Sequence, residues 1–181
     1  MICVQSGQNS SGKRYVVVFS FAANILPYRT FLQLLGKVLL PTEGLIYVPE
    51  NLNAIYVSGE PLLLNMSLME NLRFGNTKEH PEEEIWALCK LVGLGEELLY
   101  KPNLEVGENG SKLSMSNRIY ICLARALLSS VDILLLSNTL DMLSPTEGMR
   151  FLKMLREWNR AGGMSCLGAD NQEEGWSQLH G

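Results

Sequence analysis

The residues with the clearest chemical potential stand near the N-terminus, where Gly7 to Arg14 read GQNSSGKR. This stretch fits the Gly-x-x-x-x-Gly-Lys pattern of a phosphate-binding loop, with Arg14 in place of the Ser or Thr that would ligate Mg²⁺. The glycines of such a loop let backbone N–H groups approach a phosphate, and the lysine balances its charge. A working loop follows a strand and opens a helix. Because Gly12 and Lys13 instead precede a predicted strand, we interpret GQNSSGKR as a solvated turn.

The elements that would position any site begin with apolar runs that predict strands. The run YVVVFSF, residues 15–21, is rich in β-branched and aromatic residues and has no polar alternation, which is typical of a strand buried on both faces. Three further runs predict strands: residues 53–58 (NAIYVS), 131–136 (VDILLL) and 164–169 (MSCLGA).

Helix signals alternate with these strands. Pro27 suits a first helical turn, and after it the apolar residues recur at helical spacing as one face that ends at the turn PTEG, residues 41–44. That face comprises Phe31, Leu34, Leu35, Val38 and Leu39. Three later helices are predicted within residues 80–95, 114–130 and 144–163; the last opens on a Ser144-Pro145-x-Glu147 capping box.

Alternating strands and helices predict an α/β fold with a mostly parallel sheet and helices on both faces. We expect one domain over residues 1–181. Residues 12–63 and 118–170 would form the two halves of an α/β core. Residues 64–117 would form an inserted helical lobe, and residues 171–181 a polar tail.

Composition narrows the function. A net charge of −4 and an isoelectric point near 5.3 argue against nucleic-acid binding. The four cysteines are far apart and the two histidines have no neighbours at ligand spacing, so we expect neither a disulfide framework nor zinc. The uncharged run of residues 15–28 is too short for a membrane span. We expect a soluble, reduced compartment or the surface of a membrane complex, cytoplasmic or organellar.

The segment from Glu108 to Pro145 carries a resemblance to a known family. It reads ENGSKLSMSNRIYICLARALLSSVDILLLSNTLDMLSP. This string resembles the second half of an ATP-binding cassette (ABC) transporter nucleotide-binding domain: an LSGGQ signature, a helix ending in ARAL, a strand and a loop of the form SALD. The turn PTEG and the segment PLLLNMSLMENLRFG, residues 61–75, resemble two further elements of the family. The likeness covers roughly Gly12 to Gly163. It implies a P-loop NTPase core of the RecA-like, ABC ATPase type, with the family's N-terminal antiparallel sheet largely missing.

The resemblance also implies a different position for the phosphate loop. With LLGKVLLPTEG as its helix and turn, the family pattern Gly-x-x-x-x-Gly-Lys-Ser-Thr falls on residues 22–30. Ala22 and Pro27 then replace the two glycines, and Pro27 also lacks an N–H donor. Tyr28 stands in place of the lysine, and Arg29 displaces the Mg²⁺-binding hydroxyl beside Thr30.

The other family positions are changed as well. Ser137 and Asn138 stand where the family has its magnesium-linked Asp and catalytic Glu, and neither can act as a general base near neutral pH. Gly59 replaces the glutamine that ligates the metal or orients water. In the signature Ser114 is kept, whereas Met115-Ser116-Asn117 replaces Gly-Gly-Gln. A helix N-cap is the simpler role for Ser114.

These changes imply a non-catalytic, ABC ATPase-like protein that acts as a structural or interaction subunit, docked through a groove between its lobes on a membrane-protein complex or an ABC-type subunit. Neither ATP hydrolysis nor the family's ATP and Mg²⁺ is expected. The alternative is a regulatory, ATP-binding half of an ABC-type heterodimer, whose active partner supplies the P-loop and the Walker B residues. An ATPase of unusual chemistry and a decaying or truncated gene product stay open.

Overall fold

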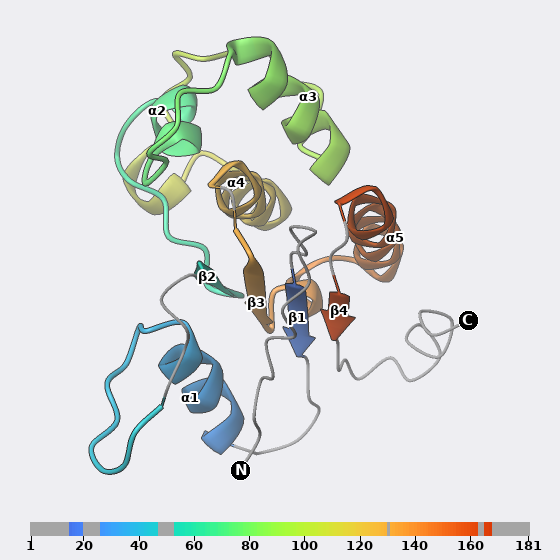
Figure 1. Cartoon of the computed structure of the whole chain (residues 1–181). Helices are drawn as coiled ribbons and strands as arrows, with labels where there is room; N and C mark the ends of the chain where they lie inside the picture. Colours follow the sequence, from blue (N-terminus) through green and yellow to red (C-terminus); the bar gives the residue numbers. More distant parts are fainter. Residues whose placement is uncertain (1–14, 20–25, 47–52, 130, 163–164, 168–181) are drawn as a thin grey trace.

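The computed structural model describes residues 15–19, 26–46, 53–129, 131–162 and 165–167. Within these residues four strands form one sheet, in the order β2-β3-β1-β4, with every pairing parallel (Figure 1). The strands are β1 (Tyr15–Phe19), β2 (Ala54–Ser58), β3 (Ile133–Ser137) and β4 (Ser165–Leu167). A small parallel sheet within a mixed helix and strand fold is therefore confirmed.

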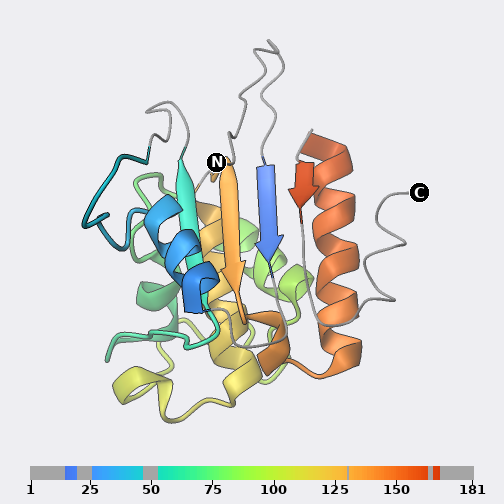
Figure 2. The same cartoon turned by 90° about the horizontal axis from the view of Figure 1, so that it is seen from below.

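Helices cover both faces of this sheet (Figures 1 and 2). They are α1 (Leu26–Leu35), α2 (Leu68–Arg73), α3 (Glu82–Val92), α4 (Met115–Leu128) and α5 (Pro145–Gly162), with 3-10 turns η1 (Glu108–Gly110) and η2 (Leu140–Met142). In the part of the chain that the structure describes, no helix is both long enough and apolar enough to span a bilayer.

Strand β3 is buried over its whole length, and its side chains serve two cores. Ile133 and Leu135 pack with Leu32 of α1 on one face. Leu134 and Leu136 join the larger core, to which α4 contributes, on the other face. This alternation follows from the two-residue period of a strand, and it explains why the run VDILLL has no polar positions.

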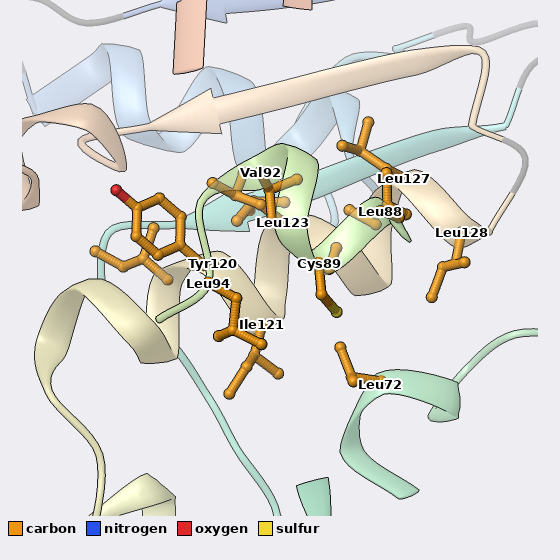
Figure 3. Close-up of a cluster of buried hydrophobic side chains, with 14 of the residues drawn as sticks. Leu72, Leu88, Cys89, Val92, Leu94, Tyr120, Ile121, Leu123, Leu127 and Leu128 are labelled. Atoms are coloured by element: carbon orange, nitrogen blue, oxygen red, sulfur yellow. The ribbon is translucent and has the colours of Figure 1, made fainter. Parts of the chain in front are cut away.

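A helical layer forms where α2 and α3 pack against α4 (Figure 3). Cys89 lies inside this layer, where burial raises the pKa of its thiol to about 12. The thiol therefore stays protonated at neutral pH and behaves as a small apolar side chain. The side chains labelled in the close-up are Leu72, Leu88, Cys89, Val92, Leu94, Tyr120, Ile121, Leu123, Leu127 and Leu128.

The predicted extent of α1 is wrong. Its apolar face was expected to continue to Leu39, but the helix ends at Leu35. The end is a Schellman motif, in which the Val38 N–H donates to the Gln33 carbonyl at 2.8 Å and Lys37 takes the left-handed conformation with φ of 57°. Leaving the helix at this point turns the chain away from the sheet.

Gly36, the residue before the left-handed Lys37, lies close to the sheet. A Cβ at Gly36 would lie 2.8 Å from the Cβ of Tyr56 on β2, so glycine lets the helix end approach the strand closely. Beyond it, Val38 and Leu39 are 56% and 42% exposed rather than part of a buried face. Helical spacing alone did not reveal that the next two apolar residues belong to a surface loop.

The termini of α3 and α5 confirm the sequence signals. Gly93 ends α3 in the left-handed conformation, with φ of 105°. At the start of α5 the Ser144 N–H donates to the Glu147 carboxylate at 2.9 Å. Hydrogen bonds from the Ser144 side chain and backbone lower the pKa of Glu147. This stabilisation is therefore present above the unfolded-state pKa and is lost as the pH falls through the folded-state value.

Helix α2 has a signal that our sequence analysis did not use. Ser67 and Glu70 form a complete capping box: the Ser67 N–H donates to the Glu70 carboxylate at 2.8 Å and the Glu70 N–H donates to the Ser67 hydroxyl at 3.3 Å. The spacing Ser-x-x-Glu before an apolar run is readable in NMSLMENL. Because α2 has only six residues, it is too short for apolar periodicity to indicate a helix.

A polar network fixes the segment that leads from β2 to α2. Asn71 is fully buried; its side-chain oxygen accepts from the Leu64 N–H at 2.9 Å and its amide donates to the Leu64 carbonyl at 3.0 Å. The Arg125 guanidinium donates to the Asn71 carbonyl at 2.8 Å and to its side-chain oxygen at 3.2 Å. One asparagine thus joins α2, α4 and the connecting segment.

We predict that Asn71→Ala lowers the free energy of unfolding by roughly 2–3 kcal/mol, because Leu64 and Arg125 lose buried hydrogen-bond partners. Urea unfolding followed by tryptophan fluorescence measures this loss. Asn76→Ala is the matched control: the Asn76 side-chain oxygen is buried without a partner in the described residues, and its amide makes one bond, to the Leu72 carbonyl. Equal losses for the two variants would contradict the role given to Asn71.

Candidate functional site

The carboxyl ends of β2 and β3 meet at one edge of the sheet, which is where ligands bind in parallel α/β folds. Ser58 is in register with Ser137, and the Gly59 N–H donates to the Ser137 carbonyl at 2.8 Å. The Thr139 hydroxyl, which is buried, donates to the Val57 carbonyl at 3.0 Å. The two strand ends are therefore joined by hydrogen bonds beyond the last paired residues.

Gly59 and Asn138 are in close backbone contact at this edge. A Cβ at Gly59 would lie 2.4 Å from the Asn138 carbonyl oxygen and 2.9 Å from its carbonyl carbon. Asn138 has a φ of 54°, in the left-handed region that asparagine tolerates better than most residues. Any side chain at position 59 would therefore have to displace backbone.

Ser137 and Asn138 at this edge are neutral. Ser137 is buried and Asn138 is exposed, and neither a hydroxyl nor an amide takes up a proton near neutral pH. Within the described residues no three His, Cys, Asp or Glu side chains gather closely enough to hold a metal ion. The arrangement can donate and accept hydrogen bonds, but it offers no carboxylate on these two residues.

The positions assigned to the phosphate loop lie on or before α1. Ala22 is outside the described residues, whereas the backbone of Pro27 and Tyr28 belongs to the first turn of α1. Arg29 forms an ion pair with Glu60 at 3.7 Å. Thr30 follows it in the helix and is exposed. The one cation of the predicted loop whose side chain is described thus has a carboxylate partner in the chain.

The signature positions lie at the start of α4. Ser114 is the N-cap, and its hydroxyl accepts from the Asn117 N–H at 3.3 Å. The Asn117 side chain accepts from the Gly95 N–H at 3.1 Å and donates to the Glu97 carboxylate at 3.1 Å. Both residues therefore hold local structure, and Asn117 anchors the loop after α3. Met115 between them is 42% exposed.

These residues are separated into three locations. Gly59, Ser137 and Asn138 lie together at the sheet edge, Arg29 and Thr30 lie on α1, and the signature residues lie at the N-terminus of α4. Arg29 is connected to the edge through Glu60, which follows Gly59 directly.

A groove of about 800 Å³ runs between the sheet side of the molecule and α4. Residues from α1, β2, the segment after β2, the end of α2 and α4 line it. Three arginines, Arg29, Arg118 and Arg125, contribute to its walls, against one acidic residue, Glu60. The groove is thus locally basic in an acidic chain, and Leu62, 76% exposed, forms part of its apolar surface.

Arg29 was a candidate site residue from the sequence, whereas Arg118 and Arg125 were not predicted to line a site. Arg118, Cys122, Arg125 and Ser129 recur at i, i+4, i+7 and i+11 on α4 and all line the groove. The Arg118 side chain donates to the Leu113 carbonyl at 3.3 Å, and Arg125 stacks over the Phe74 ring at 5.6 Å. Burial lowers the pKa of Arg125 from its usual value. The helical spacing of these polar residues is the signal that could have revealed the second face of α4.

We predict that Gly59→Ala destabilises the fold by roughly 1–3 kcal/mol, because the added methyl group meets backbone rather than a flexible side chain. Gly148→Ala on α5 is the matched control, since a Cβ there meets nothing within 4 Å. That control should be neutral or should stabilise the helix by up to about 1 kcal/mol. Chemical unfolding of both variants measures the difference. A Gly59→Ala protein as stable as the parent would refute the close contact.

Known proteins resemble most of this chain. Antigen peptide transporter 1 of Rattus norvegicus is 33% identical over 128 residues, which cover 67% of this chain and 18% of that protein. The mitochondrial iron-sulfur clusters transporter ABCB7 of Oryzias latipes is 28% identical over 141 residues, covering 68% of this chain and 19% of that protein. The chain thus spans about a fifth of the length of these curated relatives.

The fold has a solved counterpart. A bacterial Atm1-family ABC exporter, solved with ATP bound, superposes with a TM-score of 0.70 at 20% identity, over 91% of this chain and 30% of the exporter chain. At that identity the superposition supports the fold alone. No protein-family model matches the chain. The sequence relatives and the shared fold together identify the chain as a member of the ABC transporter nucleotide-binding domain family.

Proposed function

We propose that this chain is a non-catalytic member of the family, which serves as a structural or interaction subunit docked on a membrane-protein complex. The observation that carries the proposal is the backbone contact between Gly59 and Asn138. These are the positions of the family's glutamine and catalytic glutamate. Where the family would hold water and metal between two polar side chains, this chain has one missing side chain and one neutral amide.

The family's ATP and Mg²⁺ do not fit these residues. Hydrolysis requires a group that orients or deprotonates the attacking water, and a metal held by hydroxyl and carboxylate ligands. Ser137 and Asn138 carry no charge, and Arg29, which is paired with Glu60, would oppose a metal ion. We therefore derive no catalytic step through a nucleotide.

The groove between α1 and α4 supports the docking half of the proposal. The family receives helices of its membrane domains in a groove between its lobes, and this chain keeps a groove of about 800 Å³ with apolar and basic walls. Leu62 and Phe74, 76% and 50% exposed, give it apolar surface that a partner would cover. The relatives are transporters by name, which is consistent with a membrane-protein partner.

A regulatory, ATP-binding half of a heterodimer is the second candidate, and one observation favours it. Ser114, the retained signature residue, is exposed at the N-terminus of a helix of 14 residues. In the family this serine contacts a nucleotide held by the opposite subunit. Against it, the hydroxyl already caps α4, and exposed Met115 stands where the family has glycine.

We predict that the purified chain neither binds nor hydrolyses ATP. Isothermal titration with ATP, with and without Mg²⁺, should give no heat at millimolar nucleotide, and the melting temperature should not change. A bound ligand would raise it according to RT ln(1 + [L]/Kd). Phosphate release should equal that of a protein-free blank.

Two variants make the titration decisive. If ATP binds and Thr30→Ala/Ser114→Ala abolishes binding, the family site is functional and the proposal is wrong. If binding survives that change but is lost in Lys13→Ala, the N-terminal GQNSSGKR is the site and our interpretation of it as a turn is wrong. Binding without hydrolysis would favour the regulatory candidate.

The docking half has its own prediction. A photo-reactive benzoylphenylalanine at Leu62, on the groove, should form an adduct with an integral membrane protein in native membranes. The same group at Tyr100, which is 70% exposed and does not line the groove, should not. Adducts at both positions, or at neither, would refute docking through this groove.

A further inference from the structure

A second groove, of about 470 Å³, lies between α3 and α5 and shares no lining residue with the first. Helix α3 contributes Ala87, Lys90 and Leu91, and α5 contributes Arg150, Lys153 and Met154. The two helices are neighbours on the same side of the sheet in Figure 1. Nothing in the proposed function uses this face.

The apolar residues that line this groove are Ala87, Leu91 and Met154. Helix α3 directs Ile85, Leu88 and Val92 into the core, which leaves Leu91 on the opposite face with 49% of its surface exposed. Met154 of α5 also lines the groove but is only 5% exposed. Leu91 is therefore the large apolar side chain of the groove that a partner would cover.

The rim of the groove is cationic. Lys90, Arg150 and Lys153 are exposed, and none of them forms an ion pair with another residue that the structure describes. Among the residues that the structure describes, no carboxylate lines the groove. Because the whole chain has a net charge of −4, three cations around the apolar residues of the groove are a local reversal of charge.

We propose that the α3–α5 groove binds an acidic amphipathic helix of a partner protein. Apolar side chains of that helix would cover Ala87 and Leu91, and carboxylates on its flanks would meet Lys90 on one side and Arg150 and Lys153 on the other. Charge complementarity of this kind sets the register and the choice of partner.

Charge complementarity favours an acidic occupant, because Lys90, Arg150 and Lys153 surround the exposed Leu91. A lipid surface and a second copy of this chain are the other occupants that the test distinguishes. A second copy of this chain is a poor complement, because two carboxylates of the acidic run at the start of α3 are already paired: Glu82 with Arg73 and Glu84 with His80.

The test uses the full chain and a fluorescein-labelled helical peptide, with Leu along one face and Glu on both flanks. Fluorescence anisotropy at physiological salt should detect binding, and Lys90→Glu/Lys153→Glu should weaken it about tenfold or more. Lys101→Glu/Lys112→Glu changes the net charge equally at exposed lysines outside the groove and should leave affinity nearly unchanged. Leu91→Ser should also weaken binding of this peptide. A second peptide, with Gln in place of Glu, should bind the parent chain more weakly than the Glu peptide does.

Three outcomes would overturn the proposal. They are no binding of the acidic peptide by the parent chain, equal weakening by the two charge-reversed pairs, and equal affinity for the Glu and Gln peptides. Phosphatidylserine-containing vesicles are the comparison for a membrane surface. If these vesicles bind through Lys90 and Lys153 and the peptide does not, the occupant is a lipid headgroup region. A dimer that Leu91→Ser dissociates, seen by sedimentation, would assign the face to a second copy.

Discussion

Helix α4 is the element on which the rest of the structure depends, because it is buried between the sheet and the helices α2 and α3. Ile119, Leu123 and Leu127 are almost fully buried, and the helix packs against α2, α3 and strand β2. A helix in this position has little room for polar residues, and those it carries must find partners. Arg125 does so by donating to backbone and side-chain oxygens of Asn71, so that the polar side of α4 also holds the segment that leaves the sheet.

The contrast between the apolar core and the sheet edge underlies the proposal that this chain is non-catalytic. The apolar framework of an ABC domain is kept, with β3 buried throughout and helices packed on both faces. At the edge, where a nucleotide enzyme of this fold needs charge, Gly59 approaches Asn138 through backbone atoms and Ser137 is buried beside them. Basic residues instead line two grooves: Arg29, Arg118 and Arg125 in the groove beside α4, and Lys90, Arg150 and Lys153 between α3 and α5.

Apolar periodicity and helix-end signals were sufficient to predict those helix ends that depend on contacts between residues close in sequence. The capping box at Ser144 begins α5, and Gly93 ends α3, through contacts within one helical turn. Both could therefore be predicted from the sequence. The end of α1 was not predicted: it lies where Gly36 closely approaches Tyr56, which is distant in sequence. The same holds for the candidate site: the neutral residues at positions 137 and 138 can be read from the sequence, but the contact between Gly59 and Asn138 requires the pairing of β2 with β3.

The strand order has a consequence for synthesis of the chain. Strand β1 is made early, yet its neighbours in the sheet are β3 and β4, which are made more than a hundred residues later. Helices α2, α3 and α4 are close in sequence and pack on one another, so they can form while the ribosome is still adding β3. Until then the apolar strand YVVVF has no neighbour to pair with. The pairing edges of β1 are therefore unsatisfied until β3 and β4 have been translated.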